Sequence, residues 1–320
     1  MKKLSVFLAL LLGVASAMAS PLSGYRVIKE IPAPGEGSWD YLIVDEGARR
    51  LYVSHETEVE VLDVDSGAVV GKIPNTPGVH GIALDPELGR GFTSNGHANT
   101  VTIFDLKTLK VLGQVKTGEK PDAIIYDPAT HHVLAFNGDG KSATVIEAAD
   151  GKVAGTVDLK GGPEFAAADG AGFVFNNLET ESELVKIDVR KLSVVGRWPL
   201  APCQTPSSMA MDTPDRRIFI GCRSKVMAVV NADDGHVITT LPIGDHVDAT
   251  AFDPETRLIF NSNGDGTLTV IQQDSPDKYH VVENVKTQPR AKTLALDLKT
   301  HQLFLPAIVS GSFKILVVGK

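Results

Sequence analysis

This sequence has few cysteines, few aromatic residues and few long apolar runs. Its two cysteines form no CxxCH haem-attachment motif. A Ser-His-Asp nucleophile elbow, a phosphate-binding loop and a dinucleotide fingerprint are also missing, so no common catalytic motif points to a reaction. Aromatic residues make up only 6%, whereas there are 30 glycines and 18 prolines, a composition typical of many short strands joined by turns.

The one substantial apolar run, residues 4–14, favours an export signal over a membrane span. Two lysines precede it, the small-x-small sequence Ala-Met-Ala follows at residues 17–19, and the run is too short to cross a bilayer. We therefore expect residues 1–19 to be a signal peptide and residues 20–320 to form a single mature domain. No other run has spanning length, so we expect a periplasmic or secreted protein.

Positive charge is also in short supply. The formal net charge is -8, and it falls to -10 without residues 1–19, because that segment carries two lysines and no acid. An acidic chain has no general attraction for nucleic acid, so we expect no nucleic-acid partner. A small ligand or a protein partner is the expectation instead, for a chain that we expect to be a monomer.

What the sequence does contain is a repeat. An apolar run ends in an aspartate seven times, in segments such as "WDYLIVDEGARRLYVSH", "VHGIALDPELGRGFTSN" and "VDATAFDPETRLIFNSN", with spacings of 40, 42, 42, 43, 41 and 44 residues. These anchor aspartates are Asp45, Asp85, Asp127, Asp169, Asp212, Asp253 and Asp297. Two further β-like runs follow each copy, so each unit holds four strands, which predicts a seven-bladed β-propeller.

The two ends of the chain predict how the ring closes. The last copy stops after its third strand, "SFKILVVGK", and a spare strand-like run stands near the N-terminus, "YRVIKEIPAPG". We expect residues 25–31 to pair beside residues 313–318 as the fourth strand of the last blade. This closure removes sheet edges that would otherwise remain exposed.

The repeats resemble those of the YVTN-type β-propeller family of exported bacterial proteins. The matching segments are "LYVSH", "GFTSN" and "IFNSN", followed by "VTIFDLKTLKVLGQV", and the resemblance extends over essentially the whole mature chain. Copies four, five and seven, with "FVFNN", "IFIGC" and "LFLPA", depart from the motif. The resemblance implies the propeller fold and says little about activity, because the repeated residues are structural.

Topology gathers polar residues at one end of the expected channel. Five residues before each anchor, where the innermost strand begins, the sequence places Asp40, His80, Asp122, Glu164, Ser207, Asp248 and Lys292. Loops on the same face add His55, His97, Asp139, Glu179, Arg223 and Asp265. From these two sets we take Asp40, His80, His97, Asp122, Asp139, Glu164, Asp248, Asp265 and Lys292 as ligand-binding candidates. Polar residues beside a water-filled funnel also cost little free energy, so a purely structural role stays open.

The polar residues at this end of the channel also suggest a divalent metal ion as a cofactor. The candidate ligands are His80, Asp122, Glu164 and Asp248, because imidazole with carboxylate suits a transition ion. Compact metal motifs such as HExxH are missing, so the cofactor stays unknown. The Asp-Pro pairs of the repeat, by contrast, fit ordinary turn chemistry.

The two cysteines fall on one face of one blade. Cys203 lies in the crossover before blade five, and Cys222 ends the second strand of that blade. In an exported protein this placement predicts one disulfide, with a redox-active or metal-binding thiol pair as the alternative.

Two functions remain open from the sequence. The first is a binding or scaffold protein that uses the charged funnel for a small ligand or a protein partner. The second is a metal-dependent hydrolase of the lactonase type, in which Glu164, Asp122, Asp248 and His80 would be the ligands or acid–base groups.

Overall fold

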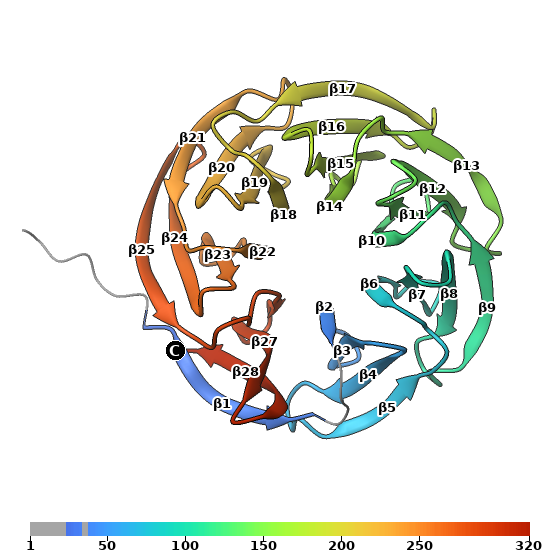
Figure 1. Cartoon of the computed structure of the whole chain (residues 1–320), viewed down its shortest axis with the longest axis horizontal. Coiled ribbons are helices and arrows are strands. Elements are labelled where there is room, and N and C mark those ends of the chain that lie inside the picture. Colours follow the sequence, from blue (N-terminus) through green and yellow to red (C-terminus); the bar gives the residue numbers. More distant parts are fainter. Residues whose placement is uncertain (1–23, 34–37) are drawn as a thin grey trace, which may run out of the picture.

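The structure, a computed structural model, describes residues 24–33 and 38–320, and the expected signal peptide lies outside these residues. The described chain forms 28 strands in seven four-stranded antiparallel sheets, set around a central axis like the blades of a ring (Figure 1). The expected all-β seven-bladed propeller is therefore confirmed. Within the described ranges, no helix is long and apolar enough to span a bilayer.

The strands fall into four concentric sets. The innermost are β2 (Trp39–Asp45), β6 (Val79–Asp85), β10 (Pro121–Asp127), β14 (Pro163–Ala168), β18 (Pro206–Asp212), β22 (Val247–Asp253) and β26 (Ala295–Asp297). The second set is β3 (Arg50–His55), β7 (Arg90–Asn95), β11 (His132–Asn137), β15 (Phe173–Leu178), β19 (Arg217–Cys222), β23 (Leu258–Asn263) and β27 (Gln302–Val309). The third is β4 (Glu58–Asp63), β8 (Thr100–Asp105), β12 (Ser142–Glu147), β16 (Glu183–Asp188), β20 (Val226–Asn231), β24 (Thr267–Ser275) and β28 (Ser312–Gly319). The outermost is β5 (Val69–Ile73), β9 (Val111–Lys116), β13 (Val153–Asp158), β17 (Ser193–Pro199), β21 (Val237–Pro242), β25 (Lys278–Lys286) and β1 (Arg26–Pro32).

The ring closes as expected, through the N-terminal strand. β1 pairs antiparallel with β28, with Val27 opposite Val318 and Ile31 opposite Ile315, so the two ends of the described chain share blade seven (Figure 1). Just before β1, the ring of Tyr25 packs edge-on against Phe260 of blade six at 5.0 Å. The closing strand is therefore held both by its backbone pairing and by a neighbouring blade.

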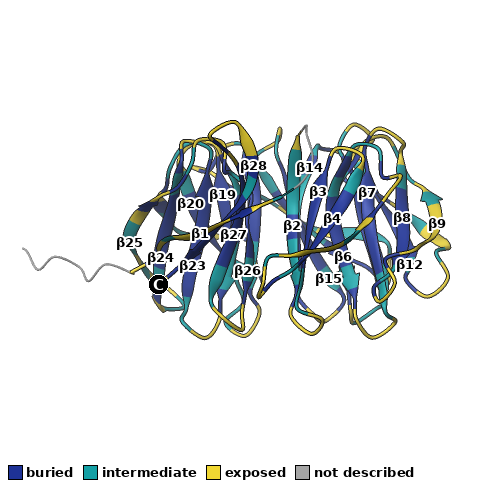
Figure 2. Ribbon diagram, turned by 90° about the horizontal axis from the view of Figure 1, so that it is seen from below, coloured by how far each residue is buried: buried dark blue, intermediate teal, exposed yellow. Residues whose placement is uncertain are grey.

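The hydrophobic core lies between adjacent blades rather than in one central mass. Figure 2 shows the inner strands largely buried, whereas the turns on both faces and outermost strands such as β9 are exposed. Each second strand contributes one large, fully buried side chain to this core: Tyr52, Phe92, Leu134, Phe175, Phe219, Phe260 and Phe304. Truncation of a buried aromatic side chain to alanine typically lowers the stability of a protein by about 3–5 kcal/mol, so these side chains contribute strongly to the packing between blades.

The anchor aspartates both cap turns and join blades. Asp45 accepts a hydrogen bond from the Ala48 backbone N–H at 2.9 Å, which fixes the turn after β2. At some junctions a basic side chain four residues after an anchor contacts the anchor of the preceding blade. Arg216 contacts Asp169 at 3.0 Å, and the side chain of His301 meets Asp253 at 2.7 Å. At these junctions the anchor carboxylate of one blade is thus tied to the turn of the next.

Asparagines at the ends of second strands tie these strands to the third strands. Asn95 donates from its amide to Thr102 at 2.8 Å, and Asn137 and Asn263 make the equivalent bonds to Thr144 and Thr269 at 3.1 and 3.0 Å. These bonds satisfy buried polar groups at the ends of the strands. The repeated asparagines are therefore structural, as the resemblance implied.

The expected disulfide is also present. Cys203 and Cys222 are bonded, with their Cα atoms 5.6 Å apart, and both residues are buried against Met209 and Ile220 in the core of blade five. The pair therefore links the crossover into blade five with the end of β19. Closing a loop of 19 residues is worth about 3 kcal/mol in the chain-entropy account.

The contact between Arg49 and Asp297 tests how much the turns contribute to ring closure. Arg49 of blade one makes two hydrogen bonds to the fully buried Asp297 of blade seven, at 2.8 and 2.9 Å. Arg49→Met leaves that carboxylate buried without its cation, so we expect the free energy of unfolding to fall by about 3 kcal/mol. Urea denaturation measures this change, with Arg26→Met, at an exposed arginine, as the control. Equal stability of the two variants would contradict this role.

Candidate functional site

A β-bulge lies at the start of six innermost strands. In blade one the register moves from Trp39 opposite His55 to Leu42 opposite Val53, so β2 holds one extra residue. The same irregularity occurs at the start of β6, β10, β14, β18 and β22. Bulges release residues from strand pairing and redirect their side chains. The sequence places its candidate residues Asp40, His80, Asp122, Glu164 and Asp248 within these bulges, all at one end of the channel.

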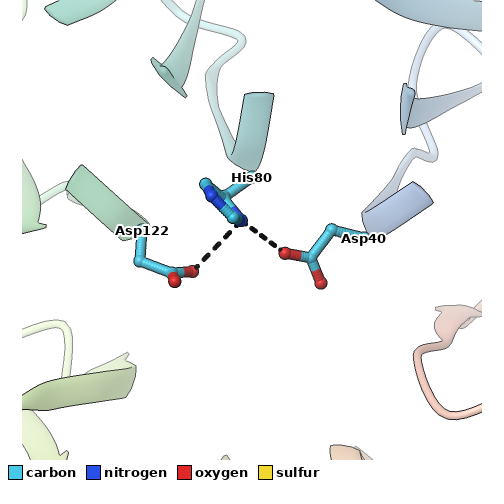
Figure 3. A group of neighbouring side chains, drawn as sticks. All are labelled: Asp40, His80 and Asp122. Atoms are coloured by element: carbon cyan, nitrogen blue, oxygen red, sulfur yellow. Dashed lines mark hydrogen bonds and ion pairs between the residues drawn. The ribbon is translucent and has the colours of Figure 1, made fainter. Parts of the chain in front are cut away.

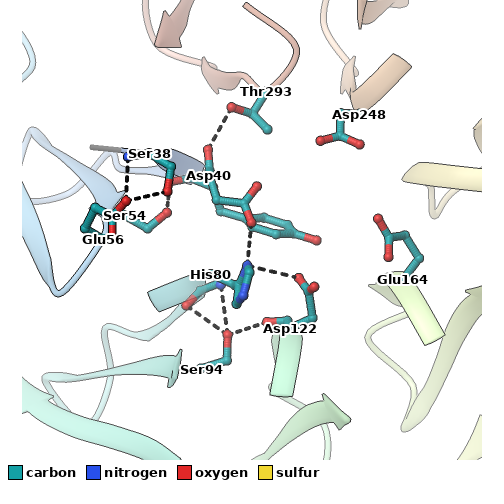
Figure 4. A network of polar contacts seen from close by, with 12 residues as sticks. Ser38, Asp40, Ser54, Glu56, His80, Ser94, Asp122, Glu164, Asp248 and Thr293 are labelled. Carbon is teal, nitrogen blue, oxygen red and sulfur yellow. Dashed lines mark hydrogen bonds and ion pairs between the residues drawn. The ribbon is translucent and has the colours of Figure 1, made fainter. Parts of the chain in front are cut away.

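Hydroxyl groups satisfy the backbone groups that the bulges release. Ser54 donates to the carbonyl of Tyr41 at 3.0 Å, and Thr293 of blade seven donates to the carbonyl of Asp40 at 2.7 Å (Figure 4). Ser94 of blade two donates to the carbonyl of Asp122 in blade three. Each of these bonds fixes the backbone of a residue at the channel mouth, and the last two come from a neighbouring blade.

Asp40, His80 and Asp122 meet at the channel mouth from three adjacent blades (Figure 3). The Nδ1 atom of His80 lies 2.7 Å from Asp40 Oδ2 and 3.8 Å from Asp122 Oδ1. A Cβ atom at Gly96 would lie 3.0 Å from Cδ2 and Nε2 of His80, so that edge of the imidazole packs against the backbone. The ring therefore presents Nδ1 to both carboxylates.

The remaining candidates gather on the opposite side of the mouth, where fixed cations accompany them. Lys292 contacts Asp248, and Arg223 lies 3.3 Å from Asp248, 3.9 Å from Glu164 and 2.7 Å from Glu179. Figure 4 shows Asp248 and Glu164 facing the same space as Asp122. Lys292 itself lies before β26 rather than in a strand, because that strand is only three residues long.

Burial and mutual repulsion shift the titration of this cluster. Burial, opposed by His80 and reinforced by Asp40 and Asp248, raises the pKa of Asp122 to about 6. Burial, followed by the charges of Asp122 and Glu179, raises the pKa of Glu164 well above its usual range.

The pKa of His80 is raised as well. Burial alone would lower it, but the hydrogen bond to Asp40 and the charge of Asp122 outweigh burial, so the pKa lies above its ordinary value. When it is protonated, His80 partly neutralises these two carboxylates. Since a histidine proton is easily displaced near neutral pH, this sector of the mouth holds a positive charge that another cation could replace.

Two aromatic side chains from non-adjacent blades meet across the channel. Tyr41 of blade one stacks on Phe165 of blade four, with ring centroids 5.2 Å apart and planes at 25°. Burial raises the pKa of the Tyr41 phenol well above its usual range, and the charges of Asp122, Glu164, Asp40 and Asp248 reinforce this shift. Beside the pair lies a cavity of about 280 Å³ among the innermost strands of blades one to four, with Ile43, Leu84 and Ile125 in its wall.

Three predicted ligand residues lie outside the cluster. His97 is exposed and packs against Gly78, and Asp139 is exposed with Lys120 at 3.9 Å. Asp265 accepts a hydrogen bond from the Asp245 backbone at 2.8 Å and so fixes a loop. His80 and His97 are therefore not a pair, and whether any of the candidates binds a ligand stays a prediction.

Sequence reasoning missed Tyr41 and Phe165. Their signal was present in the aligned repeats, because the residue after each channel-mouth position is small in four other copies: Gly81, Ala123, Ser208 and Ala249. Large rings at only two of these positions mark side chains that extend into the channel.

The two remaining polar positions of the sequence analysis, Ser207 and His55, are buried. Ser207 donates a hydrogen bond to the Val247 carbonyl at 2.6 Å, and the His55 ring stacks on Phe313 with centroids 4.9 Å apart.

The raised pKa of Asp122 makes a prediction about stability. A carboxyl group with a pKa of about 6 in the folded protein and 3.8 ordinarily destabilises the folded state when ionised, an effect that is complete above about pH 6 and absent below about pH 4. We expect Asp122→Asn to raise the free energy of unfolding at about pH 7.5 by on the order of 1–2 kcal/mol. Urea titrations of both proteins at about pH 4 and about pH 7.5 measure the difference in free energy of unfolding. A variant that is less stable at neutral pH would contradict the assignment.

Comparison with known proteins supports the fold alone. No protein-family model matches the sequence, and no curated protein matches it. Among solved structures, the chain is similar to one from "Kuenenia stuttgartiensis Hydrazine Synthase", with a TM-score of 0.76 and 15% identity over 92% of this chain and 98% of that one. A chain of a "Mitotic Checkpoint Complex" gives 0.81 and 14% over 100% and 99%, and "RRP9 WD40 repeats" give 0.79 and 11% over 94% and 99%. At these identities the likeness extends to the propeller architecture and no further.

Proposed function

We propose that this protein is an exported, monomeric binding protein of the YVTN-repeat type, which holds a small, positively charged ligand at the mouth of its central channel. The proposal is carried by one observation, the convergence of Asp40, Asp122, Glu164 and Asp248 on the space above the Tyr41–Phe165 pair. Propellers generally serve as rigid binding scaffolds, and concave sites with a few convergent polar groups are where small ligands bind.

The balance of charge supports a cation over an anion. Five carboxylates lie at the mouth when Glu179 is included, whereas the fixed cations in contact with them are Arg223 and Lys292, and Lys120 acts on Asp122 from a greater distance. Burial is the main cause of the raised pKa values of Asp122, Glu164 and Asp248, and the charges of neighbouring carboxylates raise each of them further. A bound cation would relieve the repulsion among these carboxylates, and this relief would add to the free energy of binding.

The export proposal is supported by sequence features rather than by the fold. Residues 1–19 have the composition of a signal peptide, and the buried Cys203–Cys222 disulfide suits an oxidising compartment. A ligand of such a protein would be met outside the cytoplasm.

Thermal shift with charged probes tests the ligand class. The probes are putrescine and agmatine as organic cations, Mn²⁺ and Co²⁺ as metal ions, and succinate and phosphate as anions. We expect at least one cation and neither anion to raise the melting temperature at about pH 7.5, and less so at about pH 5, where Asp122 is protonated.

The matched variants are Asp122→Asn and Glu119→Gln. Glu119 is an exposed residue in the crossover into blade three, outside the cluster, so its variant removes one negative charge without touching the site. Asp122→Asn should weaken cation binding at least tenfold, as judged by calorimetry, while the control binds like the unmodified protein. Stabilisation by anions alone, or equal binding by the two variants, would overturn the proposal.

A further inference from the structure

We propose that Asp40, His80 and Asp122 bind a divalent transition-metal ion. This inference rests on the proposed function in that it names the cation that the channel mouth holds. Of all the described residues, these three form the group of histidine and carboxylate side chains whose ligand atoms lie close enough together, within 4.8 Å of one another, to share one ion.

The three ligand atoms converge from separate blades. Asp40 stands on β2, His80 on β6 and Asp122 on β10, and in Figure 3 their side chains point toward a common centre. All three side chains are only partly exposed, at 23%, 25% and 21%. An ion in this position would thus be partly shielded from water and still reachable from the channel mouth.

This sector is also the part of the mouth that lacks a fixed cation in contact. Asp248 has Lys292 and Arg223 as partners, and Glu179 has Arg223. Asp40 and Asp122 share only His80 as a basic group in contact, and the nearest fixed cation that acts on Asp122 and His80 is the more distant Lys120. A bound ion would supply the positive charge that this pair of carboxylates lacks in direct contact.

The supports of these side chains are rigid. Thr293 holds the carbonyl of Asp40 and Ser94 holds the carbonyl of Asp122, so each carboxylate extends from a backbone fixed by a neighbouring blade. Behind His80, Gly96 leaves room for the imidazole edge that any larger residue would displace. Groups that orient metal ligands without binding the ion themselves commonly contribute about 10- to 100-fold to metal affinity.

The donor set indicates the kind of ion. One imidazole nitrogen with two carboxylate oxygens suits Co²⁺, Zn²⁺ or Mn²⁺ better than Ca²⁺, which prefers oxygen alone. Three protein ligands leave coordination positions for water or substrate. The lactonase-like hydrolase expected as the alternative function would require such an ion, which would lower the pKa of water and so supply hydroxide for ester hydrolysis near neutral pH.

Cobalt titration tests the site directly. The full-length mature protein is stripped with a chelator and titrated with Co²⁺ at about pH 7.5, following visible d–d absorption and calorimetry. We expect one ion per chain and Ca²⁺ binding at least tenfold weaker than Co²⁺, because a histidine nitrogen suits Co²⁺ whereas Ca²⁺ prefers oxygen ligands.

Two substitutions and one matched control make the outcome decisive. His80→Ala and Asp122→Asn should each lower Co²⁺ affinity at least tenfold. The Asp122→Asn variant should still fold, because it removes a carboxylate that destabilises the folded protein when ionised. His97→Ala removes an exposed histidine from the same blade, outside the three ligands, and should bind Co²⁺ like the unmodified protein.

Each failure has a distinct meaning. Cobalt binding that survives His80→Ala, or that is lost equally in His97→Ala, would overturn the metal site as adventitious surface binding. Absence of a cobalt spectrum would overturn it too. If putrescine or agmatine nevertheless stabilised the protein through Asp122, the proposed cation-binding function would stand with an organic ligand instead of a metal.

Discussion

The pairing of β1 with β28 is the interaction on which the channel mouth depends, because it builds the strand that precedes blade one into blade seven and so closes the ring. Across that junction Thr293 holds the backbone of Asp40, and Arg49 holds Asp297. If the ring opened there, Asp40 would lose a support that comes from the far end of the chain. The geometry of the carboxylates at the mouth is therefore a property of the closed ring and not of any one blade.

Much of the fold was predictable because the same strand and turn pattern occurs in seven copies along the sequence. Each anchor aspartate marks a turn, a large buried side chain follows it by six or seven residues, and the incomplete last copy matches the spare N-terminal strand. Local turn chemistry and strand alternation are encoded near the residues that use them, so a single sequence was sufficient. The Cys203–Cys222 pair followed from the same topology.

The site was only partly predictable, because its geometry arises between blades. The repeat placed Asp40, His80 and Asp122 on one ring, but the ring alone could not distinguish them from Asp248, which has its own cations. The bulges that aim these side chains are backbone irregularities without a clear sequence signal. Loop residues such as His97 and Asp139 shared the face without reaching the channel, since a common face does not imply a common centre.

The stacked rings of Tyr41 and Phe165 make the two ends of the propeller unequal. Because they come from blades one and four, they bridge the passage rather than line it. A ligand bound at the carboxylates would therefore have this aromatic pair between itself and the opposite end of the channel. On the proposed function, its entry and its release would both take place through the mouth that carries the carboxylates.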